Sequence, residues 1–170
     1  MKIRILTIVV AALFVAQAPA FAASPGSPKS TTFAVSSDVF ANCTITAADL
    51  NFGAYDPVSA NKTTPLDVST TVTVLCTKGS TGVTVGLDAG ANSAGGNRYM
   101  ATAGDTLQYE LYSDSGHTTV WSTGASAVTW AAFGPLSNGA VAKTVYGRIP
   151  AGQDVTVGHY TDLVTATVNF

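Results

Sequence analysis

Glutamate is nearly absent from this sequence of 170 residues: Glu110 is the single example, and lysine is scarce as well. Helices favour glutamate, lysine, leucine and glutamine, because these side chains lose little rotamer freedom in a helix. Threonine, valine, alanine, glycine and serine are abundant instead, and threonine and valine suit the pleated, half-buried surface of a strand. The shortage of helix formers argues against a helical fold and predicts a β-rich chain.

Long apolar runs and an excess of basic charge are also missing. Beyond the N-terminal segment, no stretch approaches the roughly 20 apolar residues of a bilayer-spanning helix. The formal net charge is −2, and a chain without a basic excess has little to offer the phosphates of a nucleic acid. We therefore expect no membrane span after the N-terminal segment and no nucleic-acid partner.

Side chains that bind metals or act as nucleophiles are few. A structural metal site usually needs about four ligands, and the chain offers two cysteines with His117 and His159. Both histidines stand beside a glycine in turn-like contexts, and we interpret them as solvated loop residues. The glycine-rich stretch over residues 90–96 lacks the lysine and the following helix of a phosphate loop. We predict no catalytic residue, no metal site and no cofactor, and hence a protein that is not an enzyme.

The large aromatic and basic side chains have structural interpretations. Trp121, Trp130 and Tyr109 are more typical of a core or a sheet face than of a sugar-binding platform. Arg98 and Arg148 are candidates to anchor a loop, because a guanidinium group can donate to several backbone carbonyls.

What is present at the N-terminus has the form of an export signal. A basic start precedes an apolar run over residues 5–16 that is too short to span a membrane. Ala20-Phe21-Ala22 then supplies the small-x-small pattern of a signal-peptidase site. We predict that residues 1–22 are a signal peptide cut after Ala22, with Ala20 as the second choice. About 148 residues then remain, with six basic against ten acidic side chains, enough for one domain with a core.

An exported chain meets an oxidising compartment, where cysteines pair. The two cysteines are Cys43 and Cys76, and we predict a disulfide between them. Closing a loop of this length stabilises a fold by about 3 to 4 kcal/mol on the chain-entropy model.

After the signal, the chain divides into a leader and one domain. Residues 23–32 are rich in proline, glycine and serine, and we predict a mobile leader. Phe33, Val35 and Val39 then alternate with polar or small residues, a period of two that is typical of an extended strand. We predict a single all-β domain over residues 33–170.

Short runs with strand character are separated by turn signals, which predicts a β-sandwich or barrel. The expected strands cover residues 43–47, 66–77, 82–88, 106–113, 118–122, 127–133, 140–150 and 161–170.

The last expected strand places Val164, Ala166, Val168 and Phe170 on one face. The sequence ends with this strand, so we expect the sheet to be one strand short, with an unpaired edge and an uncovered groove. Residues 33–39 of a second subunit can fill such a groove by strand addition. Alternatively, residues 33–39 form the first strand of their own sandwich, and the pattern alone leaves both readings open.

Motifs along nearly the whole exported chain carry a family resemblance. In order they are Cys43-Thr44-Ile45, Leu50-Asn51-Phe52-Gly53-Ala54-Tyr55-Asp56-Pro57, Val74-Leu75-Cys76-Thr77, Asn97-Arg98-Tyr99-Met100, Leu107-Gln108-Tyr109-Glu110-Leu111-Tyr112, Tyr146-Gly147-Arg148-Ile149-Pro150-Ala151-Gly152-Gln153 and Gly158-His159-Tyr160-Thr161-Asp162. Together they resemble the spore coat protein U domain, a family that includes subunits of archaic, Csu-type chaperone-usher pili.

The resemblance implies an immunoglobulin-like β-sandwich that lacks its final strand. It implies a periplasmic chaperone and an outer-membrane usher as partners, copies of the same or related subunits as neighbours, and a pilus that supports adhesion and biofilm formation. Phe33, Val35 and Val39 would then lie on the donor strand, and Val164, Ala166, Val168 and Phe170 would border the acceptor groove where the chaperone pairs. The expected location is the periplasm in transit and then the cell surface. The alternative is a self-contained secreted module of a spore coat, or one that binds carbohydrate.

Overall fold

Alternation of valine with threonine and serine builds the longest strand of the protein, β2 (Leu66–Cys76). Its side chains point alternately to the two faces of the sheet, and the buried ones include Val72, Val74 and Cys76. The computed structural model describes residues 28–134 and 139–170. The predicted signal peptide over residues 1–22 and the start of the leader lie outside the described residues.

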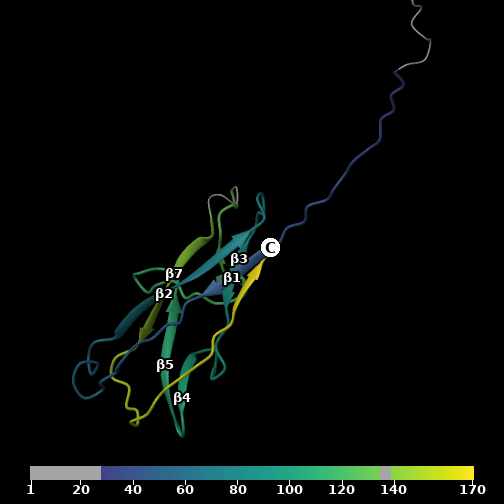
Figure 1. Cartoon of the computed structure of the whole chain (residues 1–170). Helices are drawn as coiled ribbons and strands as arrows, with labels where there is room; N and C mark the ends of the chain where they lie inside the picture. Colours follow the sequence, from purple (N-terminus) through teal and green to yellow (C-terminus); the bar gives the residue numbers. More distant parts are fainter. Residues whose placement is uncertain (1–27, 135–138) are drawn as a thin grey trace, which may run out of the picture. The chain divides into compact units, whose positions relative to one another are not determined.

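Two antiparallel sheets contain all the strands of the described chain (Figure 1). The first has the order β1-β2-β7-β5-β4. Its strands besides β2 are β1 (Cys43–Ala47), β7 (Val141–Ile149), β5 (Asp105–Tyr112) and β4 (Arg98–Thr102). The second has the order β6-β3-β8. Its strands are β6 (Val128–Thr129), β3 (Thr84–Leu87) and β8 (Ala166–Asn169). The prediction of an all-β fold is confirmed, with one short 3₁₀ turn at Gly124–Ser126.

Several expected strands differ from those in the structure. Residues 118–122 form an isolated bridge between Tyr112 and Val120 instead of a strand. Strand β4 was not expected, because its sequence follows a glycine pair and does not alternate between apolar and polar residues. The last strand begins at Ala166 rather than at residue 161, although Thr161 is bridged to Ala101. No helix in the described part of the chain is long and apolar enough to cross a membrane.

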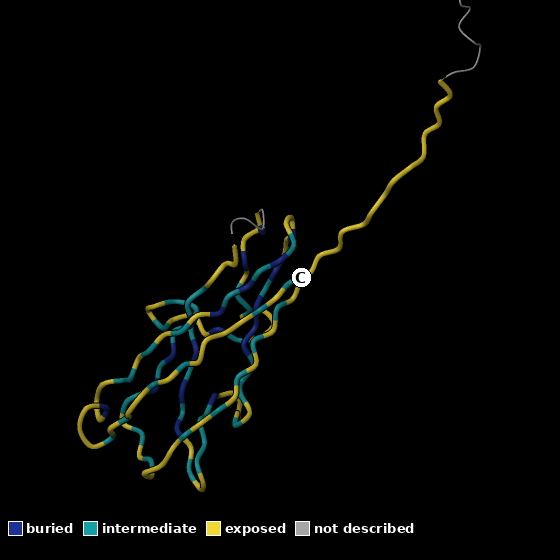
Figure 2. Tube along the Cα trace, in the orientation of Figure 1, coloured by how far each residue is buried: buried dark blue, intermediate teal, exposed yellow. Residues whose placement is uncertain are grey.

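The core lies between the two sheets and contains both tryptophans. Trp121 and Trp130 are 0% and 2% exposed, and their ring centroids lie 5.8 Å apart. The indole N–H of Trp121 donates to the carbonyl of Val85 at 2.8 Å, so its polar atom is satisfied inside the core. The interpretation of these side chains as core residues is confirmed. Figure 2 shows dark blue, buried segments concentrated in the interior strands.

The predicted disulfide between Cys43 and Cys76 is present. It joins the directly opposed first residue of β1 and last residue of β2. The N–H of Thr77 continues this pairing by donating to the carbonyl of Asn42 at 2.9 Å. The disulfide therefore fixes the edge strand β1 to the rest of its sheet.

Residues 28–37 form a unit distinct from the compact unit over residues 38–170. They have no strand assignment, although their alternation predicted a regular strand. Phe33 and Val35 are each 83% exposed, and Val39 at the start of the compact unit is 82% exposed. These apolar side chains are therefore not buried in the core.

Candidate functional site

A groove of about 940 Å³ opens into the hydrophobic interior of the unit over residues 38–170. One wall is the segment from Ala47 to Tyr55, and the other is the segment from Val155 to Val164 with Ala166. The floor is made by core side chains, including those of Val72, Leu87, Leu107, Tyr109, Leu111, Val145 and Ile149. The groove is therefore floored by interior side chains of the sandwich, which are at most 5% exposed.

After Ala47, the last residue of β1, the first wall has no regular secondary structure, and it is fixed at its two ends. The N–H of Ala48 donates to the carbonyl of Thr71 at 3.1 Å. At the other end, the Tyr55 hydroxyl donates to the carbonyl of Pro150 at 2.9 Å and accepts from the N–H of Gln153 at 3.0 Å. These bonds hold the wall against the strands on either side of it.

Between these ends, Leu50 and Phe52 turn inward and pack on β7. A Cβ atom at Gly147 would lie 2.9 Å from the Phe52 ring, so glycine is required for this close approach. The Phe52 ring also meets Tyr109 edge to face, with centroids 6.1 Å apart. Leu50 and Phe52 are only partly buried, because the space beside them is the groove.

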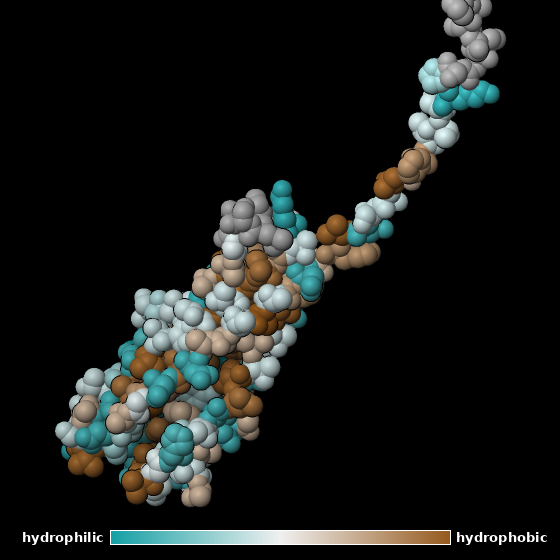
Figure 3. Space-filling model, viewed as in Figure 1, coloured by the Kyte–Doolittle hydropathy of each residue, from teal (hydrophilic) through white to brown (hydrophobic). Residues whose placement is uncertain are grey.

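From Tyr160 onward, the second wall and β8 alternate between partly buried and exposed side chains, coloured teal and yellow in Figure 2. Their partly buried residues are Tyr160, Asp162, Val164, Ala166 and Val168. The intervening side chains are exposed. The expected two-residue period is present, but Phe170 is 56% exposed. In the space-filling view, hydrophobic surface shows in patches between polar ones (Figure 3).

Backbone hydrogen bonds of the second wall run to one side only. Thr161 exchanges bonds with Ala101, and the carbonyls of Leu163 and Thr165 accept from the N–H groups of Ala91 and Asp88 at 3.1 and 3.0 Å. In an antiparallel ladder, neighbouring residues direct their N–H and C=O groups to opposite sides. The backbone N–H and C=O groups of residues 162, 164 and 166 therefore point to the opposite side, toward the groove.

The groove lies where each sheet has an edge strand. Strand β8 is the last strand of the second sheet and β1 the first strand of the other, so within residues 28–134 and 139–170 each has a single strand partner. The two edges approach each other, with Cα atoms of β1 and β8 within 8 Å. An edge strand with unpaired backbone groups is a template for the addition of another strand.

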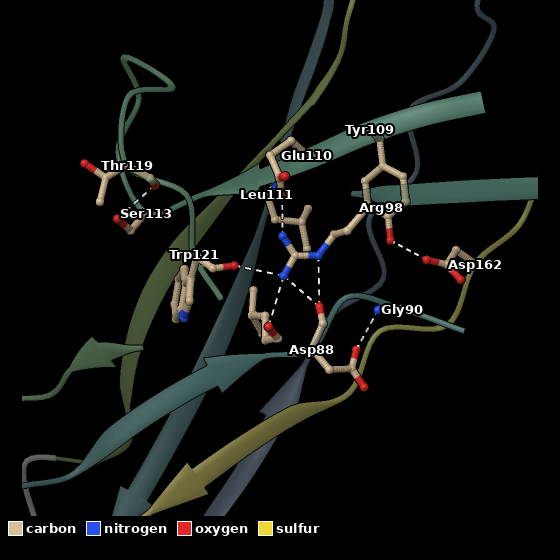
Figure 4. A network of polar contacts seen from close by, with 11 residues as sticks. Asp88, Gly90, Arg98, Tyr109, Glu110, Leu111, Ser113, Thr119, Trp121 and Asp162 are labelled. Atoms are coloured by element: carbon tan, nitrogen blue, oxygen red, sulfur yellow. Dashed lines mark hydrogen bonds and ion pairs between the residues drawn. The ribbon is translucent and has the colours of Figure 1, made fainter. Parts of the chain in front are cut away.

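Asp162 is the polar centre of the second wall (Figure 4). Its Oδ2 accepts the hydroxyl hydrogen of Tyr109 at 2.6 Å. Its Oδ1 accepts from the backbone N–H and the side-chain amide of Asn92, at 3.0 and 2.9 Å. Burial of the phenol, together with this bond to Asp162, raises the pKa of Tyr109, so the hydroxyl remains a donor.

Arg98, which is 2% exposed, holds the loop that follows β3. Its guanidinium donates to the carbonyls of Leu87, Asp88 and Trp121 at 2.7 to 3.0 Å and is paired with Glu110 (Figure 4). The prediction that this arginine anchors a loop through carbonyls is confirmed. Arg148 has a different role: it pairs with Asp67 across β2 and β7, with two bonds of 2.7 Å.

The interpretation of His117 as a solvated residue is wrong. Its side chain is 7% exposed and lies 3.7 Å from Asp67. The rings of Tyr112 and Tyr146 cover it, with centroids at 5.2 and 6.2 Å. The residues next to His117 in the sequence gave no sign of this burial, because the two tyrosines come from strands β5 and β7. His159 is exposed, as expected.

The structure brings together part of the residue set expected from sequence. Val164 and Ala166 line the groove, whereas Val168 packs at the edge of the core and Phe170 is more exposed. The residues not expected in the site are Leu50, Phe52, Leu107, Tyr109 and Asp162. Each lies within a motif noted in the sequence. The two-residue period of the last strand places Asp162 on the face of Val164 and Ala166, but no such period connects Leu50 and Phe52 with the groove.

Comparisons with known proteins agree on one family. The profile of the Spore Coat Protein U domain matches residues 29–167. "Protein U" of Myxococcus xanthus is 37% identical over 131 residues, which cover 71% of each chain. A solved structure of the CsuC–CsuE chaperone–tip adhesion subunit pre-assembly complex, from the archaic chaperone-usher Csu pili of Acinetobacter baumannii, is similar with a TM-score of 0.52 and 25% identity. That match covers 78% of this chain and 40% of the other, so this chain spans less than half of its structural neighbour.

Proposed function

The chain belongs to the Spore Coat Protein U domain family, and on that premise we propose that it is a structural subunit of a surface pilus. In this proposal, subunits join by donor-strand complementation, in which an extended segment of one copy completes the sandwich of the next. The observation that carries the proposal is the groove between residues 47–55 and 155–166, which leaves apolar wall side chains only partly buried beside the free edge of β8.

An open core is costly for an isolated subunit. Apolar surface that stays in contact with water forgoes about 25 cal/mol per Å² of stabilisation, and an edge strand with unpaired N–H and C=O groups invites pairing. A strand laid along β8 removes both costs, because its side chains fill the groove while its backbone completes the ladder. In the proposed subunit, the sandwich is immunoglobulin-like and incomplete, and the added strand would complete it.

We assign the role of donor to residues 33–39 of a neighbouring copy. Phe33, Val35 and Val39 are more than four-fifths exposed in the described chain, which leaves three apolar side chains without burial. Their spacing of two and four residues places them on one face of an extended strand. This is the pattern needed to insert side chains into a groove, with Val164 and Ala166 of the acceptor strand beside them.

The same groove needs a temporary occupant before assembly. We propose a periplasmic chaperone for this role and an outer-membrane usher for export of the fibre. The structural neighbour supports the first partner, because it is a complex of a chaperone with a pilus subunit. The protein would pass through the periplasm and reach the cell surface, where the fibre supports adhesion and biofilm formation.

A deletion tests the proposal. A variant without residues 30–39 should accept strands but be unable to donate one, so it should stay monomeric alone and cap fibres of the wild-type chain. Size-exclusion chromatography with light scattering measures both effects. Unchanged assembly of the deletion variant would contradict the proposal.

The second candidate is a self-contained module of a spore coat, favoured by the family description and by the similarity to Protein U. It requires a stable monomer that keeps its fold without a chaperone and does not bind donor segments. A carbohydrate-binding version has less support, because Trp121 and Trp130 are buried in the core.

A further inference from the structure

Asp162 forms polar contacts across the interior of the domain. Donor-strand complementation by itself does not require these contacts. The residue belongs to the groove wall that leads into β8, in the second sheet, whereas Tyr109 lies on β5 of the first sheet. The 2.6 Å bond between the phenol and the carboxylate therefore joins the wall to the floor of the groove. Tyr109 itself is 4% exposed, so water has little access to the phenol.

The same carboxylate also fixes the wall to the loop after β3. Both Asn92 bonds end on its Oδ1, and Gly90 lies so close that a Cβ atom there would overlap the carboxylate. The loop is a firm support, because the buried Arg98 guanidinium holds the carbonyls of Leu87 and Asp88.

All backbone contacts of the wall come from the side away from the groove, at Ala101, Ala91 and Asp88. With the groove empty, nothing among the described residues pairs with the other side of the wall. A segment held from one side is prone to local opening. Buried hydrogen bonds to a charged group are the stronger kind, and those of Asp162 lie at the middle of this segment.

We propose that Asp162 is the positioning residue of the acceptor groove: through Tyr109 and Asn92 it keeps residues 160–166 in the strand-accepting geometry while the groove is empty. The inference rests on the proposed function, because it assigns a role within the same groove. Its consequence is quantitative. If the wall is in place for only a fraction of the time, the apparent affinity for a donor strand is the intrinsic affinity multiplied by that fraction.

The probe is a synthetic, fluorescently labelled peptide of residues 30–41, titrated with the purified chain. Tyr109→Phe removes one hydroxyl, and Asp162→Asn changes the carboxylate with little change in shape. We expect either variant to bind the peptide about tenfold more weakly than the wild-type chain. The matched control is Tyr112→Phe, which removes a phenol from the same strand on the opposite face, and it should bind as the wild-type chain does.

Amide hydrogen exchange separates positioning from general destabilisation. In the empty Tyr109→Phe variant, the amides of residues 161–168 should exchange faster while those of β2 and β7 stay protected, and saturating peptide should restore slow exchange. If Asp162→Asn fails to fold, Tyr109→Phe carries the test.

Two results overturn different statements. Wild-type affinity together with unchanged exchange in Tyr109→Phe would overturn the role of Asp162 and leave the proposed function intact. A wild-type chain that does not bind the peptide would overturn the proposed donor. Faster exchange in the variant would then still support Asp162 as the residue that holds the wall.

Discussion

A single buried arginine organises the polar interior beside the groove. Arg98 is surrounded by core residues, yet its donors meet three backbone carbonyls and the carboxylate of Glu110. A buried charge is tolerated only when it is paired in this way. The carbonyls of Leu87 and Asp88 stand where β3 ends and the next loop begins, so the side chain helps to position the loop on which Asn92 lies.

Arg98→Met tests this role. It leaves Glu110 and the carbonyls without their donor, and we expect the free energy of unfolding to fall by about 3 to 5 kcal/mol. Urea denaturation followed by circular dichroism measures the change. The control is Arg148→Met, which breaks a partly exposed ion pair with Asp67 and should cost about 1 kcal/mol or less. Equal losses in the two variants would contradict the assignment.

Acid sensitivity also has a residue-level origin. Partial desolvation opposes ionisation of Asp114, but hydrogen bonds from the backbone N–H groups of Thr119 and Thr118 outweigh it and lower its pKa to about 2. The side-chain bond from Arg148 likewise lowers the pKa of Asp67. An unfolded aspartate has a pKa of about 3.9, so the unfolded chain binds protons first as the pH falls.

The stabilisation from these carboxylates is therefore complete above about pH 4 and lost as the pH falls toward about 2. We expect the urea midpoint of the wild-type chain to drop across this window. Asp114→Asn, which cannot titrate, should start lower at pH 6 and fall less. Parallel profiles of midpoint against pH for the two proteins would show that Asp114 does not contribute.

At the scale of elements, sequence periodicity located most strands but not their partners. Residues 43–47 were predicted as a strand with the bounds that the structure gives to β1, because threonine and isoleucine alternate up to a clear break. Strand β4 was missed, since Arg98 is buried through its carbonyl contacts and not through hydrophobicity. Local pattern also failed at His117, whose burial depends on aromatic rings from β5 and β7.

The groove was foreseen only in part. Alternation in the last strand placed Val164 and Ala166 on the inward face, where the structure also has them. The opposite wall was beyond such reasoning, because Leu50 and Phe52 lie in a segment without a regular period and reach the groove only through the space left by Gly147. The link between Tyr109 and Asp162 is a contact between residues 53 positions apart, which no local pattern reveals.

A matched pair of substitutions tests which face of the wall accepts a strand. Val164→Lys places a charge in the groove and should abolish self-association, because a buried unpaired charge is costly. Leu163→Lys, on the neighbouring residue, changes a side chain that is 75% exposed and should leave assembly unchanged. Light scattering of the two variants at equal concentration measures the difference. Loss of assembly in both, or in neither, would contradict the proposed face.

At the scale of the whole molecule, the proposed function makes the stability of the domain depend on a neighbouring subunit. The disulfide fixes β1 and the Arg98 and Asp162 contacts fix the other side of the groove. Between them, the apolar side chains of the groove walls stay only partly buried within the described chain. Phe33, Val35 and Val39 are the exposed apolar groups that match this need. Folding and assembly are then parts of one process, and the concentration of partners sets the apparent stability.

Disulfide cross-linking between copies tests this claim most directly. One copy carries Val35→Cys, and the second carries a single new cysteine in place of Leu163, Val164, Thr165 or Ala166. After mixing and mild oxidation, mass spectrometry locates the links. The account predicts links from residue 35 to positions 164 and 166, whose side chains line the groove, and few links to positions 163 and 165. Links spread evenly over all four positions, or no links between copies, would contradict it.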